Sequence, residues 1–169
     1  MFCGQAVEYI WRSLPRALEN GKDADARGEL MLAANLAIGV ETLRHLGHAI
    51  CQPVGGLLHL AHGHSCALAL PPAVRMIAGC PEVLPELKLI ASRMGLAPES
   101  KTVGEDISSA ITESNRAFGI KSLKDMGFDF EQVRAAVPLI MADGRLLPNA
   151  VVEVSEADVE TMLREMYEY

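Results

Sequence analysis

The chain has 169 residues and a mass of 18.2 kDa, a length that supports one domain with a sizeable core. Half of its residues are hydrophobic, 22% are charged and the mean hydropathy is +0.18, which excludes a disordered chain. The formal net charge is −7 and the sequence contains no run of Lys or Arg. We therefore expect neither nucleic acid nor an anionic membrane as a partner.

Cysteine use and the first residues indicate a reducing environment. Four cysteines stand at positions 3, 51, 66 and 80, without a Cys-x-x-Cys pair, and this is too few for a disulfide framework. The first twelve residues include Glu8 and lack the layout of a signal peptide. We therefore expect reduced, mostly buried thiols and a cytoplasmic location. The same twelve residues have the pattern of a helix interior, which is an unusual start for a natural protein.

The composition favours helices, because Ala, Leu, Met and Glu dominate and aromatic residues are only 5% of the chain. In chain order, the pattern predicts helices over residues 4–20, 23–45, 47–54, 65–77, 81–95, 104–118 and 155–168. The second of these is apolar on almost every side, so we expect it to be buried. Pro53 and the Gly55-Gly56 pair should end the short third helix, and Pro72 should bend or restart the fourth.

Capping residues support several of these boundaries. Gly119 is a predicted C-cap, and Ser122 and Ser155 each open a capping-box pattern with an Asp three residues later. The one β-like run, Val151–Val154, is too isolated to predict a strand. The fold class we predict is all-α, a multi-helix bundle of about seven to nine helices, with residues 1–169 forming a single helical domain.

The segment from His45 to Val74 carries the chemistry of the sequence. Its 30 residues contain no Asp, Glu, Lys or Arg and hold all five histidines, at positions 45, 48, 59, 62 and 64. A charge-free run of this length suggests a membrane span, but the histidines, a Gly-Gly pair and three prolines argue against one. We interpret it as a buried segment that lines a cleft, with imidazoles as its titratable groups near neutral pH.

Clustered imidazoles suit Zn²⁺ and Fe²⁺, and several subsets have workable spacing. His59 and His62 are three residues apart, as are His48 and Cys51. His48 and His62 flank the Gly55-Gly56 pair, where a helix–turn–helix hairpin would bring their rings together. Two imidazoles leave a site incomplete, because zinc sites use three or four protein ligands. Either Cys51 or another His completes the set, or the remaining ligands lie outside this chain. The competing interpretation is a set of histidines that only satisfy polar groups in the core.

Two motifs follow one another between Gly47 and Pro71. The first reads Gly-His-Ala-Ile-Cys-Gln-Pro-Val-Gly-Gly, and the second reads His-Gly-His-Ser-Cys-Ala before an apolar run that ends in Pro. Together they resemble the signature of the iron-containing alcohol dehydrogenases, whose two metal-binding histidines fall fourteen residues apart. His48 and His62 match those histidines in context and spacing. Residues 14–33 and 119–127 also resemble the family's helical domain, so the similarity covers nearly the whole chain.

The resemblance implies a fold, a metal and a reaction. The fold would be the all-helical C-terminal domain of that family. His48 and His62 would be ligands of Fe²⁺, or of Zn²⁺ in some members. The reaction would be reversible hydride transfer between an alcohol and NAD(P), with the metal polarising the alcohol or carbonyl oxygen.

Departures from the family pattern limit what this chain is expected to do. The family's other two ligands, in an Asp-Ala-x-x-His segment, and its N-terminal dinucleotide-binding domain are expected upstream, and neither occurs in this sequence. Gln52 stands where many relatives have a His. It should face the same site, but it cannot relay a proton at neutral pH. Cys51 and His59 are further candidates to line the cleft, and we expect ordinary polar packing for His45 and His64.

Three functional hypotheses remain. The first, which we favour, is the metal-binding helical half of an iron-type alcohol dehydrogenase, a fragment or truncated product that is inactive alone. The second is a free-standing helical domain that binds a metal, or that assembles with a separate nucleotide-binding domain. The third is a fold without a site that self-associates through apolar surface. A homo-oligomer or a separate nucleotide-binding domain is the expected partner. The sequence leaves open the alcohol, the choice of NAD or NADP, and the choice of iron or zinc.

Overall fold

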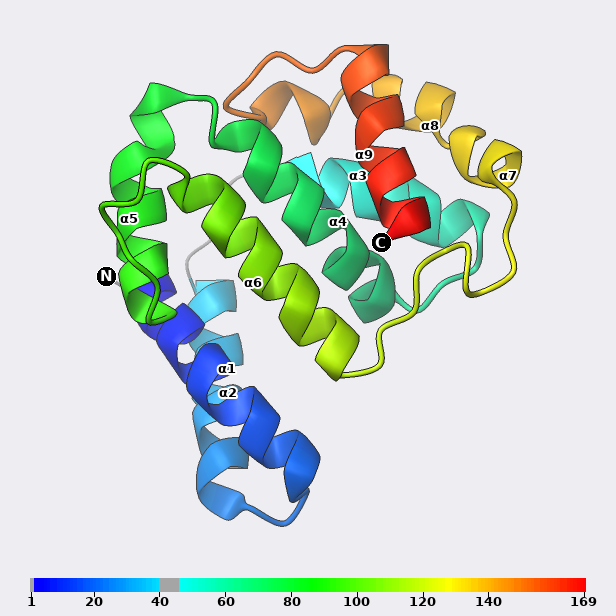
Figure 1. Cartoon of the computed structure of the whole chain (residues 1–169). Coiled ribbons are helices and arrows are strands. Elements are labelled where there is room, and N and C mark those ends of the chain that lie inside the picture. Colours follow the sequence, from blue (N-terminus) through cyan, green and yellow to red (C-terminus); the bar gives the residue numbers. More distant parts are fainter. Residues whose placement is uncertain (1, 40–45) are drawn as a thin grey trace. The chain divides into compact units, whose positions relative to one another are not determined.

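The structure is a computed structural model that describes residues 2–39 and 46–169 (Figure 1). Within these residues the secondary structure consists of nine α-helices and two short 3₁₀-helices, with no strand. The predicted all-α class is therefore confirmed. The chain divides into two compact units, one comprising residues 1–42 and 82–107 and the other residues 43–81 and 108–169. The sequence pattern gave no sign of this division.

The first unit is built on a helical hairpin of α1 (Phe2–Glu19) and α2 (Ala24–Gly39), drawn in blue shades in Figure 1. Asp23 caps α2, because its Oδ1 accepts the Ala26 N–H at 2.9 Å. The two helices are joined at Glu29 of α2. The Arg12 guanidinium lies 2.6 Å from its carboxylate, and the buried Ser13 hydroxyl donates a hydrogen bond to the same group. These contacts from Ser13 and Arg12 hold the pKa of Glu29 below its usual range.

A third helix, α5 (Leu84–Arg93), packs on α1 after the short 3₁₀-helix η1 (Pro81–Val83). Arg93 forms an ion pair with Glu8 of α1 at 2.5 Å. The predicted burial of the second helix is wrong for the part described, since Met31, Leu32 and Ile38 are 68%, 55% and 81% exposed. The helix α2 carries apolar side chains on almost every side, but α1 covers only one of these sides.

The second unit contains most of the core. Its helices are α3 (Leu46–Leu57), α4 (His62–Ile77), the part of α6 (Val103–Ala117) from Ser108 onward, α7 (Phe130–Arg134), α8 (Val137–Met141), η2 (Leu147–Asn149) and α9 (Glu156–Glu168). The largest fully buried side chains include Ile50 of α3, Leu68 of α4, Ile140 of α8 and Leu163 of α9. Burial of these apolar side chains supplies the main stabilisation of the unit.

The helix α4 runs unbroken through Pro71 and Pro72, so the predicted restart does not occur. Proline lacks the N–H that would bond to the carbonyl four residues earlier. The Ala67 carbonyl, which loses the bond from Pro71, accepts the Asn115 side-chain amide at 2.8 Å instead. The Ser108 hydroxyl also donates to the Pro71 carbonyl at 2.9 Å. Asn115 of α6 thus replaces one of the two helical hydrogen bonds that the prolines remove, and Ser108 adds a further contact between α6 and α4.

Two other boundaries also differ from expectation. The helix α3 continues through Pro53 and both glycines to Leu57, so the Gly55-Gly56 pair is not a turn. Ser122 does cap a turn, its Oγ accepting the Asp125 N–H at 2.9 Å, but no helix follows. Gly127, with φ of +92°, redirects the backbone there.

Several predicted ends are confirmed. Gly119 has φ of +77° and follows α6, in the manner of a glycine C-cap. Ser155 and Asp158 form the predicted capping box at the start of α9. Residues 151–154 form an irregular loop and no strand. The cysteines are free thiols as expected, but only Cys51 is buried, so the expectation of mostly buried thiols is wrong.

No single helix in the two described ranges combines the length and the apolar content needed to span a membrane. Residues His62–Ile77 and Pro81–Arg93 reach that length and composition only jointly, across a bend. The charge-free segment noted in the sequence is instead divided between α3 and α4.

The capping box predicts the effect of one substitution. Ser155→Ala should lower the free energy of unfolding by about 1 kcal/mol, because it removes the acceptor of the Asp158 N–H at the start of α9. Urea unfolding followed by circular dichroism measures this, with Ser92→Ala, an exposed serine inside α5, as the matched control. Equal stability of Ser155→Ala and the parent chain would contradict the role of the cap.

Candidate metal centre

The candidate site lies on the hairpin of α3 and α4. After α3 the chain turns through residues 58–61, where the Leu60 N–H donates to the Gly55 carbonyl at 2.9 Å. His59 sits in this turn with φ of +55°. A Cβ atom at Gly55 would lie 2.9 Å from the Ser65 Oγ of α4. A glycine at this position therefore lets the two helices approach closely, which is the reason that α3 carries it.

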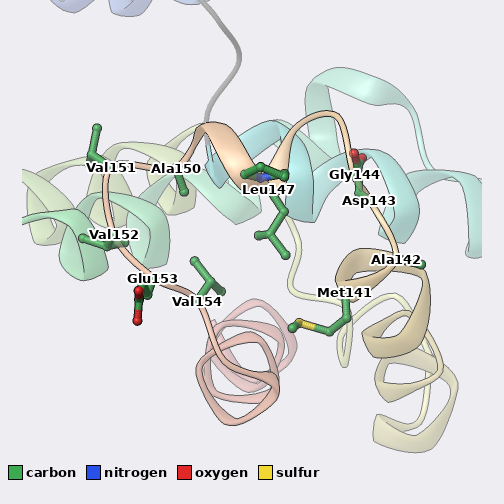
Figure 2. Close-up of a pocket in the computed structure, with 11 residues that line it drawn as sticks. Met141, Ala142, Asp143, Gly144, Leu147, Ala150, Val151, Val152, Glu153 and Val154 are labelled. Carbon is green, nitrogen blue, oxygen red and sulfur yellow. The ribbon is translucent and has the colours of Figure 1, made fainter.

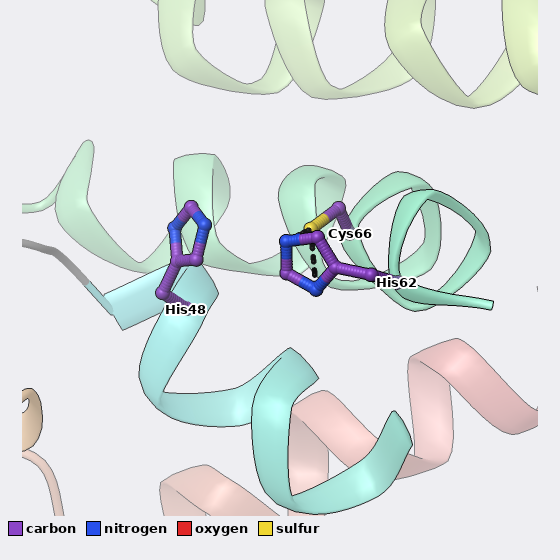
Figure 3. Close-up of side chains that lie close together, drawn as sticks. All are labelled: His48, His62 and Cys66. Atoms are coloured by element: carbon purple, nitrogen blue, oxygen red, sulfur yellow. Dashed lines mark hydrogen bonds between the residues drawn. The ribbon is translucent and has the colours of Figure 1, made fainter. Parts of the chain in front are cut away.

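The hairpin brings His48 and His62 together, as the sequence predicted. Their ring centroids are 5.6 Å apart, with the planes tilted by 41°. Cys66, one turn after His62 on α4, joins them. One donor atom from each of the three side chains lies within 4.8 Å of the other two (Figure 3). His62 is exposed, and His48 and Cys66 are half-buried, so a group that enters from solvent can reach all three.

The thiol of Cys66 stands close to the rings. Its Sγ lies 3.4 Å from His62 Nε2, within reach of a hydrogen bond that involves sulfur. The Sγ of Cys51 also lies 3.4 Å from the Sγ of Cys66. Burial raises the pKa of the Cys51 thiol to about 12, with further contributions from its hydrogen bond to Cys66 and the charge on that neighbour. Cys51 therefore stays protonated near neutral pH and acts as a hydrogen-bond donor.

Other candidate residues have different surroundings. Gln52 is exposed on α3, and its Oε1 accepts from Arg145 Nη2 at 3.4 Å. His59 is exposed in the turn, and its proposed place in a cleft stays a prediction. His64 donates from Nε2 to the Lys121 carbonyl at 2.8 Å, which agrees with the polar packing expected for it. His45 lies outside the described residues.

Sequence reasoning missed Cys66. The signal was present, since residues four apart share one face of a helix and Cys66 stands four residues after His62. The predicted start of this helix at residue 65 placed His62 outside it and hid that relation. In the structure α4 begins at His62 itself.

An apolar hollow of about 280 Å³ adjoins the cluster. His48 and Cys66 line it together with apolar side chains that include Leu46, Leu70 and Val74. It offers a place for the hydrocarbon part of a small molecule beside the donor atoms.

A larger hollow, of about 640 Å³, is formed by the loop before α9. Figure 2 shows Met141, Leu147 and Val154 around the same space. The Asp143 carboxylate at its edge already accepts the N–H groups of Leu146 and Arg145, which lower its pKa. This hollow brings no set of metal-ligating side chains together, so the α3–α4 cluster is the better candidate.

Comparison with known proteins agrees with this geometry. The sequence profile described as "Fe-containing alcohol dehydrogenase family, C-terminal" matches residues 1–167. The chain is 30% identical to alcohol dehydrogenase 4 of Saccharomyces cerevisiae over 168 residues, which are 98% of this chain and 43% of that protein. It is 28% identical to maleylacetate reductase 1 of Cupriavidus pinatubonensis over 95% of this chain and 43% of that protein.

A solved structure gives the same picture. The alcohol dehydrogenase from Oenococcus oeni superposes with a TM-score of 0.83 at 28% identity, covering 98% of this chain and 44% of that one. The chain therefore belongs to the iron-containing alcohol dehydrogenase family, and it corresponds to the C-terminal helical domain of its relatives. It spans less than half the length of the relatives it matches.

Thiol reactivity tests the local geometry of the cluster. In the folded chain Cys51 should react with iodoacetamide at neutral pH more than about a hundredfold more slowly than in the chain unfolded by urea, because burial raises its pKa to about 12. Cys3, which is exposed, serves as the internal control. Mass spectrometry of peptides reports both rates. Similar rates for Cys51 in the folded and unfolded chains would contradict the structure at this point.

Proposed function

We propose that this chain is the metal-binding helical half of an NAD(P)-dependent alcohol dehydrogenase of the iron-containing type, and that it is inactive alone. One observation carries the proposal: the α3–α4 hairpin brings His48 and His62 to 5.6 Å between ring centroids. These are the two residues that match the family's metal-binding histidines. A random pair of surface histidines would have no such relation to a family motif.

The donor set fits a divalent metal of borderline softness. Neutral imidazoles suit Fe²⁺ and Zn²⁺, and His48 and His62 would hold the ion from one side. A metal bound there would act as a Lewis acid toward an alcohol or carbonyl oxygen. The hollow beside His48 would take the adjoining carbon chain and keep water away from it. The metal itself, iron or zinc, is part of the proposal.

Hydride transfer also needs a nicotinamide cofactor. Dinucleotide-binding domains of the Rossmann type use a parallel sheet and the loops at its edge, and the described residues of this chain form helices without a strand. We propose that NAD(P) is bound by a separate domain, and the length of the relatives, more than twice that of this chain, supports this. The names of two matched relatives give different substrates, an alcohol in one case and maleylacetate in the other. We therefore propose no single substrate for this chain.

A chimeric enzyme tests this function. The chain alone, loaded anaerobically with Fe²⁺ or Zn²⁺, should give no alcohol-dependent reduction of NAD⁺ or NADP⁺. Fused behind the remaining, preceding part of the yeast alcohol dehydrogenase 4, it should support turnover, and His48→Ala and His62→Ala should each abolish it. The matched control is His64→Ala, because His64 is held by the Lys121 carbonyl. Turnover by the chain alone, or full activity of the His48→Ala, His62→Ala double variant, would refute the proposal.

The alternative function is a free-standing helical domain that binds a metal or self-associates. It is favoured by the exposed apolar side chains of α2, notably Met31 and Ile38, because patches of this kind mark surfaces that associate. For a dehydrogenase half or a self-associating domain, we propose that the partner is a second copy or a separate nucleotide-binding domain. The free thiols support a cytoplasmic location for the assembly.

Sedimentation analysis separates the two kinds of partner. If the chain self-associates, its mass should be a multiple of 18.2 kDa, and Met31→Lys with Ile38→Lys should shift it toward the monomer. Glu19→Lys, at the exposed end of α1, is the control for an added charge. A monomer at all concentrations would count against self-association and leave the separate domain as the partner.

A further inference from the structure

We propose that the Cys66 thiolate is a third metal ligand, so that this chain by itself provides a two-imidazole, one-thiolate site with His48 and His62. The inference rests on the proposed function, because it shares the two histidines. It adds a ligand that the family resemblance does not supply, since the family's remaining ligands were expected upstream of this sequence. With three ligands, the site would hold a metal without a second domain.

The distances support a shared ion. With metal–sulfur and metal–nitrogen bonds of about 2.3 and 2.0 Å, two ligand atoms of a tetrahedral zinc site lie about 3.5 Å apart. The Cys66 Sγ and His62 Nε2 are 3.4 Å apart, which is already the edge of such a tetrahedron. His48 offers a nitrogen within 4.8 Å of both. His62 is exposed, and rotation of its ring would close the remaining distance.

The backbone fixes two of these ligands relative to one another. His62 and Cys66 are one turn apart on α4, so their spacing is set by the helix and not by a flexible loop. A further hydrogen bond from the Ser65 hydroxyl to the His62 carbonyl, at 3.0 Å, holds this first turn. His48 arrives from α3, where Gly55 permits close packing of the two helices. A site that needs little rearrangement loses little free energy to ordering when the ion binds.

Cys51 is a donor to this site and not a ligand. It is fully buried, and the three-residue cluster consists of His48, His62 and Cys66. The Cys51 thiol lies 3.4 Å from the Cys66 sulfur, where its S–H can donate to a thiolate. Hydrogen bonds of this kind hold a metal ligand in its orientation. The two cysteines therefore have distinct roles, which makes them a matched pair for experiment.

A thiolate ligand changes the preference for the metal. On binding, the Cys66 thiol gives its proton to solvent and the sulfur lone pair bonds to the ion, with no change in oxidation state. Thiolates favour zinc over ferrous iron more strongly than imidazoles or carboxylates do. The chain should consequently select Zn²⁺ from a mixture with Fe²⁺, and three protein ligands would leave the fourth position open.

Cobalt(II) titration tests the inference directly. The full chain, kept reduced with a phosphine under argon, should bind one Co²⁺ and develop the near-ultraviolet charge-transfer band of a cobalt–thiolate bond. Cys66→Ser should lose the band and weaken Zn²⁺ binding by at least about tenfold, as measured by competition with a chromophoric chelator. Cys51→Ala should keep the band but bind Zn²⁺ more weakly, because the hydrogen bond to Cys66 is lost. Cys3→Ser should leave both the band and the affinity unchanged. Circular dichroism checks the fold of every variant, and Cys66→Ala replaces Cys66→Ser if the serine variant is unfolded.

Each result bears on the inference. The spectrum of the parent chain tests it even if a variant fails to fold. Metal binding without a charge-transfer band, or with equal affinity in Cys66→Ser, would overturn the role of Cys66 and leave the two histidines as ligands. A band that persists in the His48→Ala, His62→Ala double variant would place the thiolate in a different site. No binding at all would also overturn the inference, because three ligands of this chain would not suffice. That last outcome leaves the proposed function intact, since its test is turnover in the chimera.

Discussion

The close packing of α3 against α4 is the constraint on which the second unit depends. It is set where the backbone of Gly55 faces Ser65, since a side chain at Gly55 would meet the Ser65 hydroxyl at 2.9 Å. The approach places His48 of one helix beside His62 of the other. A side chain at position 55 would force the Ser65 hydroxyl to turn and would disturb its hydrogen bond to the His62 carbonyl.

A hydrogen bond from α6, and not the packing of α3, explains why α4 tolerates two consecutive prolines. A helix interior normally loses stability at proline, because one hydrogen bond is missing and the ring crowds the preceding turn. Here the Ala67 carbonyl is satisfied by Asn115 of α6, and the helix continues through both prolines to Ile77. Core residues such as Leu68 then fasten α4 to the rest of the unit. The contact with Asn115 thus overrides the low helix propensity of the two prolines.

Under the proposed function, a division of labour between domains would account for the remaining features. The relatives are more than twice as long as this chain, and the helices described here offer metal ligands and an apolar hollow without a sheet for a dinucleotide. The exposed apolar side chains on α2 offer a surface that the proposed partner would cover. If Cys66 completes a three-ligand site, metal binding and cofactor binding become separable, and the helical part could be loaded with metal before it meets a partner.

The sequence by itself determined the fold class, the family and the pairing of His48 with His62. Helical periodicity and motif spacing can be read from the order of the residues, without knowing how the helices pack. It also located the capping box of α9 and the glycine end of α6. The tertiary structure alone decided where α3 and α4 begin and end, because proline and glycine weaken a helix only when neighbours fail to compensate. Because α4 begins at His62 and not at the predicted residue 65, Cys66 lies one turn after His62 and joins the candidate site. The exposure of α2 was likewise beyond the sequence, since an apolar helix is buried only if something packs on every side of it.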